Sequence, residues 1–66
     1  MKKKLTERET EVLSLLQEGL IGKEVAGELN ISVRTVETYC RNIYDKLGVR
    51  NVTAALYRAR ELEVLV

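Results

Sequence analysis

The sequence predicts an all-α fold, a compact four-helix domain that contains a helix-turn-helix. Apolar residues recur at intervals of three and four, as they do on one face of a helix. Residues that cap helix starts precede these stretches, and Gly or Asn follows them. The chain has 66 residues and no proline, so we expect one small domain with uninterrupted helices. The expected helices span about residues 7–18, 23–29, 33–47 and 52–62.

Capping residues define the first two helices and the turn that follows them. Thr6 and Glu9 have the spacing of a capping box, in which each side chain accepts a hydrogen bond from the other residue's amide. Gly19 and Asn30 come after the two helices, and both residue types tolerate the left-handed conformation that ends many helices. A three-residue link from Asn30 then leads to the next helix, which is the length of a helix-turn-helix turn.

The third helix combines an apolar stripe with an unusual polar face. Its expected N-cap is Ser32. At about 100° per residue, the apolar stripe consists of Val36, Cys40, Ile43 and Leu47. The opposite face carries Arg34, Thr38, Arg41 and Asp45, with Glu37 at its edge. Arginine can donate two hydrogen bonds to a guanine edge, and a threonine methyl can contact a thymine methyl, so this face suits the DNA major groove.

The fourth helix is expected to begin at Val52, with Asn51 as its N-cap. Asn51-Val52-Thr53 also matches an N-glycosylation sequon, but capping is the favoured interpretation. Small alanines on this helix would let another helix approach closely. Among single residues, we expect Cys40 to be buried in the core and Tyr44 and Tyr57 to be half-buried packing residues. A role in a dimer is the alternative for Tyr57.

Charge is unevenly distributed along the chain, although the net charge is only +1. Basic residues outnumber acidic ones by two over residues 33–50, and Lys2, Lys3 and Lys4 form a basic arm, residues 1–4, that we expect to be flexible. Acidic residues concentrate in the first helix. The low net charge is weak evidence for a nucleic-acid partner. The distribution of charge along the chain nevertheless places basic residues where they could face phosphate.

The composition excludes several classes of function. With one Cys and no His, the chain forms neither an internal disulfide nor a structural zinc site, and we expect no cofactor. It has no glycine-rich phosphate loop and no nucleophile–base pair, so we do not expect an enzyme. It also lacks an apolar run of 18 residues and an apolar leader, which predicts a cytoplasmic protein without a membrane partner.

A set of residues at fixed spacing covers nearly the whole chain. It comprises Leu5-Thr6, Arg8-Glu9, Glu11-Val12-Leu13, Gly19-Leu20, Lys23-Glu24-Val25-Ala26, Leu29, Ser32, Thr35-Val36, Ile43, Lys46-Leu47-Gly48-Val49 and Ala55. On these residues the chain resembles the LuxR-type helix-turn-helix domain, also called the NarL/FixJ or GerE type. The resemblance implies that residues 5–66 bind double-stranded DNA in a bacterial transcription regulator, such as the output domain of a response regulator. RNA polymerase is a further expected partner.

The resemblance also assigns roles to single positions. The implied base contacts are Glu37, Thr38 and Arg41, to which the helical position adds Arg34. The expected phosphate contacts are Lys23, Ser32, Thr35, Tyr39 and Lys46, where Tyr39 replaces a common histidine of the family but keeps a hydrogen-bond donor. The fourth helix is implied to form a homodimer, and its expected interface residues are Val52, Ala55, Leu56 and Ala59.

Several positions depart from the family pattern. Ile21-Gly22 replaces a usual Ser-Asn pair and removes the side-chain cap of the second helix. Val52 and Ala54 replace polar residues, a change that either strengthens a dimer or removes a salt bridge. Glu37 stands where lysine is most common. It either accepts a hydrogen bond from cytosine N4 or pairs with Arg41 one helical turn later.

A second hypothesis belongs to another class of function. The low net charge and Glu37 are compatible with a helix-turn-helix that has become a protein-interaction module and pairs through its fourth helix. DNA mobility at low salt distinguishes this hypothesis from a DNA-binding regulator.

Overall fold

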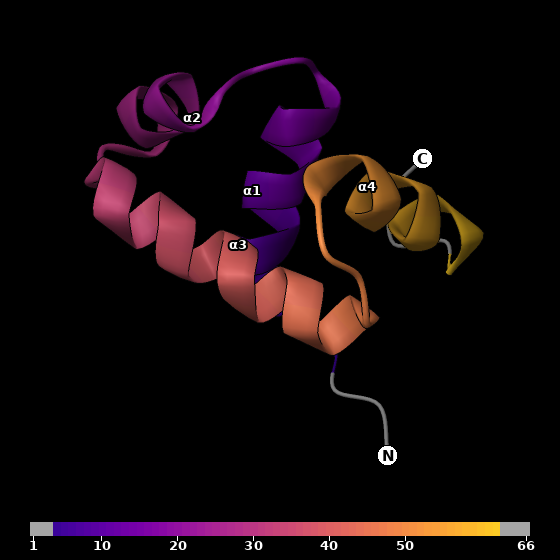
Figure 1. The fold of residues 1–66 in the computed structure, drawn as a ribbon. Helices are drawn as coiled ribbons and strands as arrows, with labels where there is room; N and C mark the ends of the chain where they lie inside the picture. The colour runs from indigo at the N-terminus through magenta and orange to yellow at the C-terminus, as the bar shows by residue number, and fades with distance from the viewer. Residues whose placement is uncertain (1–3, 63–66) are drawn as a thin grey trace.

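The structure is a computed structural model that describes residues 4–62. This part of the chain contains four α-helices and no strand: α1 (Glu7–Gln17), α2 (Gly22–Leu29), α3 (Val33–Leu47) and α4 (Val52–Glu61) (Figure 1). The all-α prediction is therefore confirmed, and each boundary agrees with the expected one to within one residue. Of the expected basic arm, residues 1–3 lie outside the described residues, and Lys4 is exposed.

Side-chain caps begin three of the four helices. In the expected capping box of α1, the Glu9 amide donates to Thr6 Oγ1 at 3.1 Å and the Thr6 amide donates to Glu9 Oε1 at 2.8 Å. Ser32 accepts from the third amide of α3 at 3.0 Å, and Asn51 accepts from the third amide of α4 at 2.8 Å. Each cap satisfies a backbone donor that the helix itself leaves unpaired.

At the start of α2, only one of the two hydrogen bonds of a capping box is formed. The N-cap residue Ile21 offers no side-chain acceptor, and its side chain is 63% exposed. The Glu24 carboxylate nevertheless accepts from the Ile21 amide at 2.9 Å. One half of a capping box therefore remains where the sequence predicted that the cap is lost.

The first three helices end in the same way. A residue with a positive φ angle stands one or two positions after each helix, with 97° at Gly19, 57° at Asn30 and 70° at Gly48. In each case the next amide donates back to a carbonyl five residues earlier, which is the pattern of a Schellman motif. The donors Leu20, Ile31 and Val49 bond to Leu15, Ala26 and Tyr44 at 3.3, 3.0 and 2.9 Å. All three donors are apolar residues packed on the core, so each turn fixes the direction in which the chain leaves its helix.

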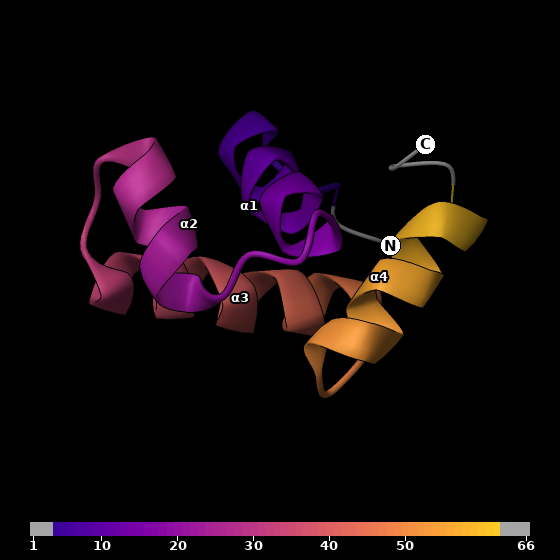
Figure 2. The ribbon, with the colours of Figure 1, turned by 90° about the horizontal axis from the view of Figure 1, so that it is seen from above.

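The core gathers around α3, which packs against each of the other helices. Figure 2 shows α3 extending beneath α1 and α2, with α2 over its N-terminal half and α4 across its C-terminal end. The buried residues are Val12, Leu13, Val25, Ala26, Val36, Ile43, Leu47, Ala55 and Ala59. No helix within residues 4–62 is both long and apolar enough to cross a membrane.

Two expectations about single residues need correction. Cys40 is half-buried and packed against the core, rather than part of the fully buried stripe. Tyr57 is 66% exposed, since it lies on the side of α4 opposite the buried alanines. Tyr44 is half-buried, as expected.

Candidate nucleic-acid interface

The outer face of α3 carries a shallow polar hollow. Arg34, Glu37, Thr38 and Arg41 line it, and all four side chains are exposed. The apolar stripe of Val36, Ile43 and Leu47 holds the other side of α3 in the core. The structure thus brings together the four residues that the sequence predicts as base contacts.

The charged groups of this hollow are not neutralised by one another. No ion pair within residues 4–62 involves Arg34, Glu37 or Arg41. The suggested pairing of Glu37 with Arg41 is therefore not formed. Both guanidinium groups and the carboxylate remain available to an external partner.

Thr38 has a more restricted set of possible contacts. Its hydroxyl donates to the Arg34 carbonyl at 3.2 Å, one helical turn earlier. Because a hydroxyl has a single hydrogen, the side chain keeps only its oxygen lone pairs and its methyl group for a ligand. Thr38 can therefore accept a hydrogen bond or make an apolar contact.

Two hydroxyl groups meet at the first turn of α3. Ser32 Oγ and Thr35 Oγ1 are 2.9 Å apart, and Ser32 Oγ also accepts from the Thr35 amide. The pair holds two hydroxyl hydrogens, and the bond between them uses one. One hydrogen therefore remains free at an exposed helix N-terminus, where the helix dipole favours an anion.

The other predicted phosphate contacts differ in exposure. Lys23 is exposed in the first turn of α2, and Tyr39 is half-buried on α3 and packed on the core. The third, Lys46, is directed into the protein. Its Nζ donates to Glu9 Oε1 at 2.7 Å, and only 18% of its side chain is exposed. This geometry differs from the expectation that Lys46 contacts phosphate.

Glu9 and Lys46 form a buried ion pair between α1 and α3. Burial raises the pKa of the Glu9 carboxyl, but the hydrogen bonds from Lys46 and Thr6 outweigh it, so that the pKa lies below the ordinary value of 4.5. This ion pair was not predicted from the sequence, because Glu9 was expected only to cap α1. The sequence does contain one sign of a buried ion pair, because the acidic residue Glu9 lies on the same side of α1 as Val12 and Leu13.

Cys40 carries the single thiol of the chain, a group that can bind a metal or undergo oxidation. Burial raises the pKa of its thiol and outweighs the lowering by a hydrogen bond with Tyr44, and the nearby charge of Glu37 raises this pKa further. The thiol is therefore protonated at neutral pH, which makes it a weak nucleophile. Within the described part of the chain, no three His, Cys, Asp or Glu residues could together hold a metal ion.

The expected dimer residues of α4 divide into two groups. Ala55 and Ala59 have no exposed surface in the single chain, because they pack into its own core. In the single chain they therefore offer no surface to a partner. Val52 and Leu56 are half-buried and leave part of their apolar surface exposed.

Comparison with known proteins agrees with this arrangement. The family described as bacterial regulatory proteins, luxR family, matches residues 3–59. The crystal structure of the response regulator ChrA, from a heme-sensing two-component system, matches with a TM-score of 0.94 and 42% identity over 98% of this chain. The match covers 32% of ChrA, so the chain spans about a third of that protein.

A second similar structure has nearly the same length as this chain. The transcription factor GerE matches with a TM-score of 0.89 and 32% identity, over 97% of each chain. The family match covers most of the sequence, and the fold agrees over almost all of it. The chain belongs to the LuxR family of bacterial regulatory proteins, and its four helices form the helix-turn-helix fold with which these transcription regulators bind DNA.

Proposed function

We propose that the domain binds double-stranded DNA sequence-specifically, with α3 in the major groove, and acts as a homodimer. The observation that supports this most strongly is the polar hollow of α3, in which four exposed side chains lie opposite the core-facing stripe. An α-helix fits the major groove. A helix that is held by its apolar side can present such a hollow to the base edges.

Each side chain of the hollow has a chemically distinct contact in this proposal. Arg41 and Arg34 donate to guanine O6 and N7, and Glu37 accepts from cytosine N4. Thr38 contacts a thymine methyl or accepts from an amino group, since its hydroxyl hydrogen is already used. Together these groups favour a half-site that contains G·C pairs.

Contacts with phosphate position the helix in the groove. The free hydroxyl hydrogen of the Ser32–Thr35 pair donates to one phosphate, beside the amides of the first turn of α3. Lys23 reaches a phosphate from the start of α2, and the hydroxyl of Tyr39 donates to another from α3. These groups set the register of the protein on DNA and carry no sequence information.

The dimer contact belongs to the exposed side of α4. Tyr57 is an exposed apolar side chain of this helix, and Val52 and Leu56 leave part of their apolar surface uncovered about 100–140° around the helix from it. A second copy would pair its α4 with this one around Tyr57 and place two α3 helices on two half-sites. With a net charge of only +1, one copy has little general attraction for DNA, so two copies are needed for stable binding.

The experiment that tests the proposal is selection of bound DNA from a random pool, followed by measurements on the selected site and on random DNA. We expect Arg41→Ala to weaken binding to the selected site by about 1–3 kcal/mol and to weaken binding to random DNA much less. Arg8→Ala serves as a matched control, because it removes an exposed guanidinium from α1. If Arg41→Ala weakened binding to both DNAs equally, Arg41 would not make a base-specific contact. Failure to bind any DNA at low salt would favour the protein-interaction module instead.

A further inference from the structure

A second hollow, which we call the α1–α2 groove, lies between these two helices. It has a volume of about 530 Å³. Leu5, Leu15 and Leu29 supply its apolar lining, and Glu7, Glu11 and Glu28 supply its acidic groups. The proposed DNA contacts use none of these residues.

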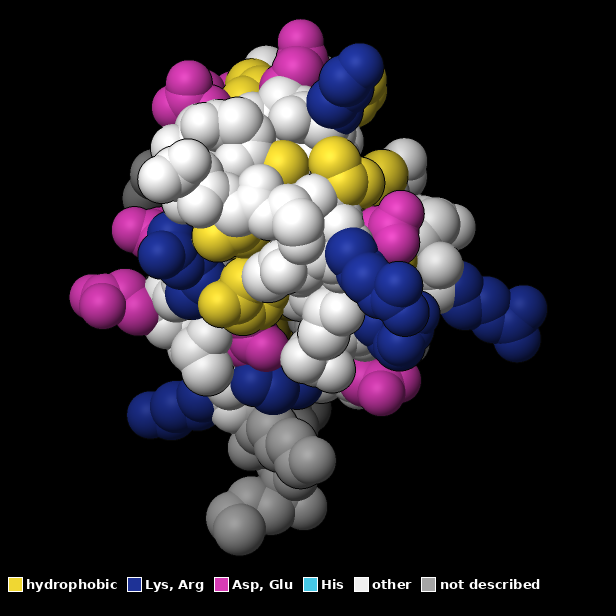
Figure 3. Space-filling view, turned by 90° about the vertical axis from the view of Figure 1, so that its left-hand side faces the viewer, with side chains coloured by type: hydrophobic (Ala, Val, Ile, Leu, Met, Phe, Trp, Pro, Cys, Tyr) yellow, Lys and Arg dark blue, Asp and Glu magenta, His cyan; other side chains and the backbone are white. Residues whose placement is uncertain are grey.

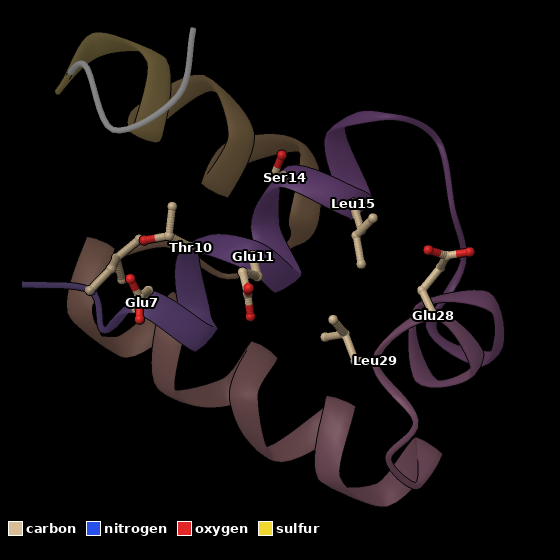
Figure 4. Close-up of a pocket in the computed structure, with 8 residues that line it drawn as sticks. Glu7, Thr10, Glu11, Ser14, Leu15, Glu28 and Leu29 are labelled. Carbon is tan, nitrogen blue, oxygen red and sulfur yellow. The ribbon is translucent and has the colours of Figure 1, made fainter.

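The side chains of the groove are arranged as an apolar floor between acidic flanks. In Figure 4, Leu15 and Leu29 point toward one another across the gap between α1 and α2, and Glu11 and Glu28 lie on opposite sides of them. Both leucines are half-buried and pack on the core, so the floor is held in place. Figure 3 shows apolar side chains that reach the surface on one side of the molecule, with charged side chains around them.

The acidic flanks are largely unneutralised. Glu7 and Glu28 take part in no ion pair within residues 4–62, and Glu11 is paired only with Arg8, at 3.3 Å. Both members of that pair are about half exposed, and such surface pairs contribute little. The groove thus combines exposed apolar surface with a negative potential, which repels nucleic acid and attracts cations.

The groove opens away from the outer face of α3. On α1, its residues Glu7, Thr10, Glu11 and Ser14 lie about 150° around the helix from the core-facing residues Glu9, Val12 and Leu13. α3 packs on the core-facing side of α1. A ligand in the groove therefore leaves the polar hollow of α3 accessible.

We infer that the α1–α2 groove binds a basic amphipathic helix of a partner protein. The apolar stripe of such a helix covers Leu15 and Leu29, and lysine or arginine side chains on its two borders meet Glu11 and Glu28. This is the helix-in-groove mode of recognition. Charge complementarity favours a basic helix, because an acidic helix would be repelled on both flanks. The apolar stripe is also required, since a purely polar cation would leave the leucines uncovered.

The first test uses three synthetic peptides and the isotopically labelled 66-residue chain. One peptide has Leu and Lys at helical spacing, the second has Glu in place of Lys, and the third has Ser in place of Leu. We expect the Leu–Lys peptide to bind and to shift the NMR signals of groove residues, and we expect the other two not to bind. The leucines are varied in the peptide because those of the protein also pack in its core. Signal shifts centred on α3, or equal binding of either comparison peptide, would overturn the inference.

The second test changes the acidic flanks. The double variant Glu11→Gln/Glu28→Gln should bind the Leu–Lys peptide at least about fivefold more weakly and lose much of the salt dependence of binding. The matched control is Asp45→Asn/Glu61→Gln, which removes two exposed carboxylates from α3 and α4. Circular dichroism checks that both variants are folded. Equal weakening by the two double variants, or none by either, would show that the groove is not the binding site.

Discussion

At the scale of single residues, Glu37 contributes the negative charge of the polar hollow on α3. Its carboxylate is exposed and has no ion-pair partner within residues 4–62. In contact with DNA such a group repels every phosphate, but it gains a hydrogen bond only where a base presents an amino group. Glu37 should therefore increase selectivity at the expense of general affinity.

The variant Glu37→Gln tests this role. We expect binding to random DNA to become about two- to tenfold tighter, because one repulsive charge is removed, while the preference for the selected site decreases. Competition between selected and random DNA measures both effects. Glu28→Gln is the control for charge, since it removes a carboxylate in the α1–α2 groove. If Glu37→Gln strengthened binding to both DNAs equally, Glu37 would have no part in base reading.

Glu9 makes stability depend on pH. Its pKa in the folded domain lies below the ordinary 4.5 because Lys46 and Thr6 donate to the carboxylate. A group with a lowered folded pKa stabilises the fold above its unfolded pKa, and this contribution is lost as pH falls through the folded value. We therefore expect the free energy of unfolding to decrease as the pH is lowered below about 4.5, with Glu9→Gln showing a smaller decrease. Urea denaturation from pH 6 to pH 3 provides the measurement, and identical slopes for the two proteins would contradict the assignment.

At the scale of secondary-structure elements, α2 has the weakest start of the four helices. Ile21 lacks an acceptor, and only the Glu24 carboxylate bonds across this end. Ile21→Ser should complete the capping box and stabilise the domain by about 1 kcal/mol, which raises Tm by roughly 4–8 °C in a domain of this size. Thermal unfolding followed by circular dichroism checks the value. Ile21→Ala is the control without an acceptor, and an equal gain from this variant would show that the cap is not responsible.

Local features of the elements could be predicted from the sequence. The capping box of Thr6 and Glu9 and the turns at Gly19 and Asn30 depend on residues within a few positions of one another. Neighbouring residues therefore specify them without knowledge of the fold. The polar hollow of α3 follows for the same reason, since a single helix determines which side chains share its outer face.

Features that depend on contacts between helices could not be predicted in this way. Glu9 and Lys46 are 37 positions apart, and neither local sequence shows that the two side chains meet. For α4, periodicity identified the apolar side but not what covers it. Ala55 and Ala59 pack in the chain's own core, which leaves Tyr57 exposed instead. The same pattern is compatible with an internal contact or a contact between two copies.

At the scale of the whole molecule, three surfaces point in different directions. The polar hollow lies on α3, the α1–α2 groove opens on the far side of α1, and Tyr57 is exposed on α4. One small domain therefore has separate surfaces for the proposed DNA, the proposed helical partner and a second copy. Each contact can be removed without directly altering the other two.

The variant Tyr57→Ser tests the dimer contact. We expect binding to a DNA with two half-sites to become about tenfold weaker, because the contact between copies supplies part of the binding free energy. Binding to one half-site should stay within about twofold, since Tyr57 does not approach the DNA in this arrangement. Titrations of both DNAs measure the difference, and Tyr57→Phe, which keeps the ring, is the control. Equal weakening on the two DNAs would argue against a dimer through α4.

The ion pair between Lys46 and Glu9 has a consequence for how binding responds to ionic strength. A cation that neutralises a DNA phosphate releases a condensed counterion, and each such contact adds about −0.9 to the slope of log K against log salt concentration. The Lys46 ammonium is already neutralised inside the protein, so it releases none. Among the proposed phosphate contacts, Lys23 is then the one cation that contributes, and it adds about −0.9 to the slope per copy. A buried carboxylate of α1 thereby reduces the sensitivity of DNA binding to salt.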